Sequence, residues 1–241
     1  MSIQGKMLRR IVGCRETEIN RMGWWWERVI AGLVARGEAV PICFGQVYAL
    51  VADARDEKAV ARVREIKKRG KDKPFAMLAA SHTTSLMADL DRVHKDLHKW
   101  FAPALIEKHF GAKGFMRFPI KTDWGLAEGL IGPENLVQTF TFAGDPVAHR
   151  LEEILRVALK RKHPRGYGEI LCTSFNISGR PSITERGAAV ELARGSKLAV
   201  VVHRGNEPKQ GSYSIYRFSE TVEKLRHGTG SDEIDPHLNL R

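Results

Sequence analysis

An apolar run that ends in a polar turn is the feature that most constrains this chain. Gly168–Cys172 has the pattern of a short buried strand, and the residues that follow are rich in serine, asparagine, glycine and proline. Ser174 and Asn176 lie two residues apart, so an extended backbone would point their side chains to the same side. The pattern predicts a strand end that offers hydrogen bonds to a ligand. A plain turn leading to a helix capped by Thr184 explains the same residues.

A cationic helix end is the second informative feature. Ala54–Arg69 has the apolar spacing of a helix, with Asp53 or Asp56 available as its N-cap and Gly70 suited to the position after its last turn. Lysine and arginine are concentrated at its C-terminal end, in the run Lys67–Pro74. Positive charge there also complements the helix dipole, so a purely structural role is the alternative to an anion-binding site.

The balance of charge indicates a polyanionic partner. Lysine and arginine together number 39 against 28 aspartate and glutamate, which gives a formal net charge of +11. A nucleotide phosphate, an RNA, or both would complement this charge. Because the positive residues are spread along the chain, a generally basic surface is the alternative explanation.

The alternation of strand and helix patterns predicts an α/β fold. Strands are predicted at 40–52, 75–79, 168–172, 198–202 and 213–218, and helices at 16–36, 54–69, 81–100, 146–163 and 185–194. A length of 241 residues suits one domain. We expect a single domain over 1–241, with an N-terminal helical segment in 1–36. The segment 108–133 is glycine-rich without clear periodicity, and we expect a lid or an inserted hairpin there.

Cysteine and histidine spacing gives no sign of a metal site. Cys14, Cys43 and Cys172 are far apart, which favours reduced thiols in the cytoplasm over a disulfide framework or a zinc site. His94 and His98 lie four residues apart but have no third ligand nearby, so a solvated helix face is the better explanation. We find neither a signal-peptide pattern nor an apolar run of roughly 20 residues, so we expect a soluble cytoplasmic protein without a membrane partner.

Together, the two stretches resemble motifs of the YrdC/YciO family, the threonylcarbamoyl-adenylate synthases. That family has a Lys-x-Arg followed by Lys-Pro and, later in the chain, a Thr-Ser-x-Asn-x-Ser-Gly segment. Here they stand as Lys67–Arg69, Lys73-Pro74 and Thr173–Gly179. The resemblance runs from about Arg36 to Gly230. It implies a divergent member whose open, twisted mixed sheet is flanked by helices around a basic cavity.

The resemblance also implies a reaction. A carbamate made from bicarbonate and the amine of threonine attacks the α-phosphate of ATP, in the presence of Mg²⁺, and yields threonylcarbamoyl-AMP and pyrophosphate for tRNA threonylcarbamoyladenosine modification. Nucleotidyl transfer of this kind needs positioning and positive charge more than a covalent nucleophile. The cationic run and the polar strand end meet that need.

Site residues follow from the same motifs. The resemblance implies catalytic roles for Lys67, Arg69, Ser174 and Asn176. It implies nucleotide-binding roles for Lys73, Thr173, Ser178, Ser212 and Arg226, and substrate-binding roles for Pro41 and Tyr48.

Departures from the family pattern concentrate on the amino-acid side. The family usually has two threonines in the run after the proline that corresponds to Pro41, whereas this chain has Ile42–Gln46 there. The arginine of a family Gly-x-Arg-x-Pro strand is missing from Val137–Pro146, and Arg117 or Lys121 are candidates to supply the lost charge. The resulting hypothesis is a divergent enzyme that binds ATP and uses threonine, another amine, or carbamoyl phosphate as in the related domain of carbamoyltransferases.

A non-catalytic module that binds double-stranded RNA or tRNA through the same basic cavity is the competing hypothesis, since such binding needs only shape and phosphate contacts. Lys160, Arg161 and Lys162 at the end of a predicted helix are candidate RNA contacts. A solvated helix end explains that cluster equally simply.

Overall fold

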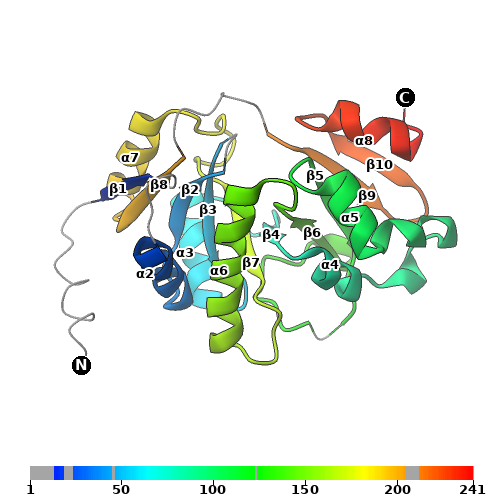
Figure 1. Ribbon diagram of the computed structural model, residues 1–241, viewed down its shortest axis with the longest axis horizontal. Helices are drawn as coiled ribbons and strands as arrows, with labels where there is room; N and C mark the ends of the chain where they lie inside the picture. The colour runs from blue at the N-terminus through cyan, green and yellow to red at the C-terminus, as the bar shows by residue number, and fades with distance from the viewer. Residues whose placement is uncertain (1–13, 19–23, 45–46, 123, 205–211, 241) are drawn as a thin grey trace.

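The computed structural model describes residues 14–18, 24–44, 47–122, 124–204 and 212–240. These residues form a mixed sheet with the strand order β1-β8-β2-β3-β7-β4-β6-β5-β9-β10 (Figure 1). The strands are β1 Arg15–Glu18, β2 Val40–Cys43, β3 Tyr48–Asp53, β4 Ala76–Leu78, β5 Gly114–Pro119, β6 Leu136–Phe140, β7 Ile170–Ser174, β8 Val200–His203, β9 Ser214–Phe218 and β10 Val222–Arg226.

The sheet combines parallel and antiparallel pairs. β4 pairs parallel with β6 and β5 pairs parallel with β9, whereas β7 runs antiparallel to both of its neighbours, β3 and β4. β1 and β10 stand at the two ends of the strand order and do not pair with each other. The prediction of an α/β protein with an open mixed sheet is therefore confirmed.

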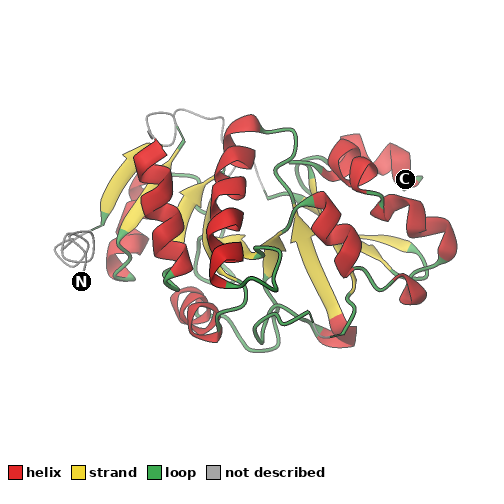
Figure 2. Ribbon diagram, turned by 60° about the horizontal axis from the view of Figure 1, so that its bottom comes forward, coloured by secondary structure: helices red, strands yellow, loops and turns green. Residues whose placement is uncertain are grey.

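Helices cover both faces of the sheet. They are α2 Trp24–Ala35, α3 Glu57–Lys67, α4 Ser81–Met87, α5 Pro103–Phe110, α6 Pro146–Lys162, α7 Arg186–Gly195 and α8 Ser231–Leu238. Short 3-10 helices occupy Leu90–Arg92, Lys95–Phe101 and Pro133–Asn135. Figure 2 shows the strands spread across the molecule with these helices packed against them.

Alternation along β3 assigns the helices to faces. Val51 packs in the cluster formed with α2 and α6, whereas Leu50 and Ala52 pack in the cluster formed with α3 and α7. Because successive side chains of a strand point to opposite faces, α2 and α6 lie on one face and α3 and α7 on the other. α4, α5 and α8 close a third cluster around Met116 and Tyr216 at the other end of the sheet.

α6 begins at Pro146 as predicted, whereas α3 begins at Glu57, after Asp56, the second of its two predicted caps. Asp56 caps α3, its carboxylate accepting hydrogen bonds from the backbone N–H groups of Lys58 and Ala59. Asp145 caps α6 in the same way, with proline at the first helical position. The prediction for Gly70 is wrong, because Lys68 takes the left-handed conformation after α3, with a φ of 50°.

Two predictions near the N-terminus need correction. Of the predicted helix at 16–36, the structure describes α2 at Trp24–Ala35, and Arg15–Glu18 is instead a strand that pairs parallel with β8. Backbone pairing with the edge of β8 outweighs the local helical pattern there. The strand predicted at 40–52 is a hairpin of β2 and β3, and the Gly45-Gln46 break between them lies outside the described residues.

The long helix predicted at 81–100 is also wrong. α4 ends at Met87, Ala88 is extended, and the chain continues as 3-10 turns. The backbone N–H of Asp89 donates to Pro119 O and that of His94 donates to Ser219 O. These bonds to strand ends replace the bonds that a continuous helix would make.

The segment 108–133 contains a central strand of the sheet rather than only a lid or an added hairpin. β5 lies between β6 and β9 and pairs with β6 over 116–119 and with β9 over 114–117. Its side chains alternate between the α5 side, where Met116 and Phe118 are fully buried, and the opposite face. α8 was not anticipated from the sequence. None of the helices in the described residues is long and apolar enough to cross a bilayer.

Candidate functional site

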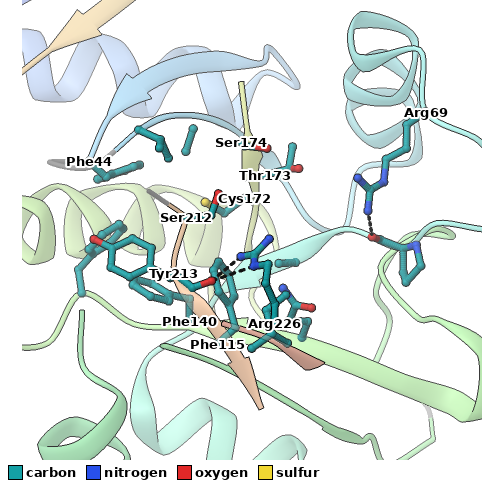
Figure 3. A pocket seen from close by; sticks show the side chains of 17 residues that line it. Phe44, Arg69, Phe115, Phe140, Cys172, Thr173, Ser174, Ser212, Tyr213 and Arg226 are labelled. Atoms are coloured by element: carbon teal, nitrogen blue, oxygen red, sulfur yellow. Dashed lines mark hydrogen bonds between the residues drawn. The ribbon is translucent and has the colours of Figure 1, made fainter. Parts of the chain in front are cut away.

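A pocket opens on the face of the sheet that carries α2 and α6, at the end of β7 (Figure 3). Five segments that are distant in sequence meet there: the β2–β3 turn, the α3–β4 loop, β5 with β6, the end of β7, and β9 with β10. Its described lining is Phe44, Val47, Ala49, Arg69, Pro74, Ala76, Phe115, Gln138, Phe140, Phe142, Cys172, Thr173, Ser174, Ser212, Tyr213, Ile215 and Arg226. The space open to the centre of a water molecule is about 180 Å³.

The end of β7 brings polar groups to the pocket, as its sequence predicts. Thr173 and Ser174 line it, and the Ser174 hydroxyl donates to Asn176 Oδ1 over 2.7 Å. Asn176 is 8% exposed, and its amide nitrogen donates to Arg180 O. The hydroxyl of Ser174 is thereby held in one orientation at the rim of the pocket.

Lys67 hydrogen-bonds to the segment that contains Ser174 and Asn176, and it is not part of the described lining. Its side chain is 1% exposed. The ammonium donates to Asn176 Oδ1 over 2.8 Å, to Asn176 O over 3.1 Å, and to Ser174 O. Burial and the nearby charge of Arg69 lower the pKa of Lys67 to about 7. The structure thus places Lys67, predicted to be catalytic, as the residue that positions Ser174 and Asn176.

Arg69 reaches the pocket because α3 has already ended. Its Nε donates to Lys73 O over 3.0 Å and its Nη2 to Pro74 O over 2.8 Å, and the guanidinium lies 5.1 Å from the ring centroid of Phe75. Burial and the charge of Arg64 lower the pKa of Arg69. These bonds use one edge of the planar group, which leaves its other N–H groups for an anion.

Arg226 and Ser212 approach from the opposite side of the pocket. Two nitrogens of Arg226 donate to Tyr213 O, over 3.0 Å and 2.6 Å, which fixes the guanidinium at the mouth (Figure 3). The Ser212 hydroxyl lies 3.3 Å from that of Ser182. The described lining therefore contains two arginines and no aspartate or glutamate. The pocket is suited to an anionic ligand.

Five aromatic residues form one side of the pocket, which we term the aromatic wall: Phe44, Phe115, Phe140, Phe142 and Tyr213. Phe44 stacks on Phe142 with ring centroids 4.4 Å apart, and Phe140 lies 4.7 Å from Tyr213. Sequence reasoning missed this wall. The spacing of Phe140 and Phe142, two residues apart, is the signal that would place both rings on one face.

The chemistry of the lining favours binding over covalent catalysis. Burial raises the pKa of the Cys172 thiol to about 12, so it remains protonated at neutral pH and is a poor nucleophile. Burial also raises the pKa of the Tyr213 hydroxyl. No group of three or more potential metal-binding side chains occurs in the part of the chain that the structure describes. Mg²⁺ prefers oxygen ligands, and with no carboxylate in this lining it would enter on the phosphates of a nucleotide.

The remaining predicted site residues are not part of the described lining. Lys73 is exposed beside it, and Ser178 bonds through its backbone N–H to Lys67 O. Pro41 is buried within β2. Tyr48 points to the α3 and α7 side, where its hydroxyl lies 2.5 Å from His203 Nδ1. The side chains of Pro41 and Tyr48 therefore do not line the pocket to which Ser174 and Arg69 belong.

The basic residues at the end of α6 differ in their contacts. Lys162 is held by Asp53 over 2.7 Å and by Asp56 over 2.8 Å. Lys160 and Arg161 are exposed, and the Lys160 ammonium lies 6.0 Å from the ring centroid of Tyr167. Of the three predicted RNA contacts, Lys162 thus already has two carboxylate partners within the fold.

Comparison with known proteins shows which family the chain resembles. The model Sua5_yciO_yrdC, described as "Telomere recombination", matches residues 34–107. A Threonylcarbamoyl-AMP synthase of Pyrococcus abyssi (strain GE5 / Orsay) is 30% identical over 200 residues, which is 81% of this chain and 50% of that protein. These matches support a YrdC-like family member. This YrdC-like chain spans about half the length of that relative.

Solved structures share the YrdC-like fold. P. abyssi Sua5 complexed with L-threonine gives a TM-score of 0.67 at 24% identity, over 89% of this chain and 57% of that one. E. coli YciO gives 0.64 at 13% identity, over 89% of this chain and 94% of that one. At these identities the likeness concerns the fold alone.

Proposed function

We propose that this YrdC-like chain forms a carbamoyl-adenylate from ATP, bicarbonate and an amine, with L-threonine as the first amine to consider. One observation carries the proposal. The cationic α3–β4 loop and the polar end of β7 meet in a single pocket that has two arginines and no acidic side chain in its described lining. The name of the P. abyssi relative supports the same reaction.

The reaction would proceed in two bond-forming stages. The amine adds to bicarbonate with loss of water and gives a carbamate. A carbamate oxygen then attacks the α-phosphorus of ATP, the bond from that phosphorus to the bridging oxygen of the β-phosphate breaks, and pyrophosphate leaves with the electron pair. Mg²⁺ carried by the phosphates would neutralise part of the charge. Since the carbamate is itself the nucleophile, the lack of a reactive thiolate at Cys172 is no obstacle.

Each part of the pocket has a role in this proposal. Arg69 and Arg226 would bind phosphate oxygens through N–H groups left free by their backbone contacts. The hydroxyls of Thr173, Ser174 and Ser212 would complete the hydrogen bonding of the phosphates or of a carboxylate. The aromatic wall would receive the adenine ring by stacking. Lys67 would act by positioning Ser174 and Asn176.

The identity of the amine is the open part of the proposal. Tyr48 bonds to His203 on the other side of the sheet, and Phe44 stacks on Phe142 where the family pattern has polar residues. P. abyssi Sua5 has been solved with L-threonine. Threonine is therefore the reference amine, and an amine with a larger apolar side chain is the alternative that the aromatic wall favours. The adenylate would serve tRNA modification.

Calorimetric titration with ATP, Mg²⁺ and bicarbonate tests the proposal. We expect saturable binding at one site per chain, strengthened when the productive amine is added. Asn176→Ala should weaken the binding, because the Ser174 hydroxyl and the Lys67 ammonium both lose Asn176 Oδ1 as a hydrogen-bond acceptor. Arg161→Ala, outside the pocket, is the matched control and should bind as the wild type does. Absence of any heat of ATP binding in the wild type would refute the proposal.

Binding of RNA is the second candidate function, supported by the net charge of +11 and by the exposure of Lys160 and Arg161 at the end of α6. This candidate predicts affinity for double-stranded RNA or tRNA that falls steeply with salt concentration and that Lys160→Ala with Arg161→Ala reduces. Such affinity without ATP binding would favour a non-catalytic module over the enzyme.

A further inference from the structure

Arg117 stands on β5, on the face of the sheet that carries the pocket. Phe115 and Arg117 are two residues apart on this strand, and Phe115 lines the pocket. Side chains two apart in a strand share a face. Met116 and Phe118, which lie between and beyond them, are buried on the opposite face against α5 and α8.

The register of the sheet places Arg117 next to the lining. On one side it is the cross-strand partner of Gln138 in β6, which is itself a lining residue. Directly opposed side chains in antiparallel strands have Cβ atoms about 4.5–5.5 Å apart. On its other side Arg117 is paired with Arg217 of β9.

The Arg117 guanidinium lies beside the α3–β4 loop. A methyl group added to Gly132 would come within 2.8 Å of Pro74 Cγ and 3.5 Å of Arg117 Nη2, so these two groups flank the same glycine. Pro74 lines the pocket, and its carbonyl accepts a hydrogen bond from Arg69. Arg117 is therefore at the same edge of the pocket as Arg69.

Among the residues that the structure describes, Arg117 has no carboxylate partner. Its side chain makes no hydrogen bond or ion pair with any residue that the structure describes, whereas its neighbour Arg217 pairs with Glu134 over 2.5 Å. Burial and the charge of Arg217 lower the pKa of Arg117, more than the partly compensating charge of Glu134 raises it. An anion that contacts a partly buried cation beside another positive charge stabilises that cation.

We propose that Arg117 is the third anion-binding arginine of the pocket and that it contacts the outer phosphates of a nucleoside triphosphate. The order of the lining residues gives the direction. Phe142 follows β6, Phe140 and Gln138 lie on β6, and Arg117 is opposite Gln138. A ligand whose base rests on the wall extends its phosphate chain past Arg69 toward Arg117. The inference rests on the proposed function, and it assigns to β5 the charge that the family pattern places on the β6 segment.

The test measures ATP, AMP and inorganic pyrophosphate binding by calorimetry, with folding checked by thermal melting. Arg117→Gln should weaken ATP and pyrophosphate binding by about tenfold or more, the effect of losing one charge-assisted contact, and should change AMP binding far less. The double variant Arg117→Gln with Gln138→Arg should recover most of the affinity. Its new arginine supplies a guanidinium from position 138, directly opposite position 117 in the neighbouring strand. Lys121→Gln is the control, since Lys121 bonds to Leu86 O and is not part of the described lining.

The outcomes separate this inference from the proposed function. Wild-type ATP binding that Arg117→Gln leaves unchanged overturns the role of Arg117 and leaves the proposed function in place. Pyrophosphate binding that depends on Arg117, in a wild type that binds no ATP, supports the anion site and overturns the nucleotide function. Equal losses for ATP and AMP, without recovery in the double variant, indicate a structural role and contradict the inference.

Discussion

Lys67→Met is expected to lower the free energy of unfolding by about 3 kcal/mol and to remove ATP binding, because buried acceptors that lose their donor keep their desolvation cost. Methionine fills a similar volume, but it leaves Ser174 O, Asn176 O and Asn176 Oδ1 without the ammonium that binds all three. Denaturant unfolding measures the first effect and calorimetry the second. Lys58→Met, an exposed position on the same helix, is the matched control and should change neither.

The unfolding free energies of the wild type and of Lys67→Met are expected to depend differently on pH. Burial and Arg69 lower the pKa of Lys67 to about 7 in the folded protein, whereas an unfolded lysine titrates near 10.4. Between these values the unfolded chain binds the extra proton, so the unfolding free energy of the wild type rises with pH relative to Lys67→Met. The slope is at most about 1.4 kcal/mol per pH unit. This contribution is complete above the unfolded pKa and is lost as the pH falls through about 7. Parallel pH profiles for the two proteins would contradict the lowered pKa.

Replacing both lining arginines is expected to have a large effect on ligand binding while leaving the fold intact. Arg69→Gln combined with Arg226→Gln should weaken ATP binding by about two orders of magnitude or more, since each arginine supplies charge-assisted hydrogen bonds to phosphate. Each single variant should show part of this loss. Glutamine retains a polar group of similar reach, so folding should be preserved.

Arg161→Gln provides the control for this loss of charge. Arg161 is exposed at the end of α6 and is not among the described lining residues. Removing its charge should leave ATP affinity within about threefold of the wild type, as expected for a screened surface charge. An equal loss in Arg161→Gln and in the double variant would mean that net charge, rather than the pocket, governs the binding.

The parts of the fold predicted from sequence are those whose signals are local. β7 follows its apolar run, α3 begins at the aspartate cap of Asp56, and α6 begins at Asp145-Pro146. The predictions fail where hydrogen bonds to backbone that is distant in sequence outweigh the local pattern. Arg15–Glu18 forms a strand because the edge of β8 is available, and the segment after Met87 leaves the helix because strand ends accept and donate its backbone bonds.

The site shows the same division. Ser174 and Asn176 were predicted to point to one side, and they are hydrogen-bonded to each other. The burial of Lys67 behind them could not be foreseen, because it depends on how α3 packs under the β7 turn. The spacing of Phe140 and Phe142 is a local signal, but the rest of the aromatic wall comes from segments that only the pairing of distant strands brings together.

The most direct test of the central claim is release of pyrophosphate from ATP, with the adenylate product identified by mass spectrometry. The proposed function predicts release by the wild-type chain that requires both bicarbonate and an amine, threonine first, and that Arg69→Gln with Arg226→Gln abolishes. A product mass equal to AMP plus the N-carboxylated amine minus one water would identify the substrate. Tight ATP binding without release of pyrophosphate for any amine would contradict the claim that this pocket forms a carbamoyl-adenylate.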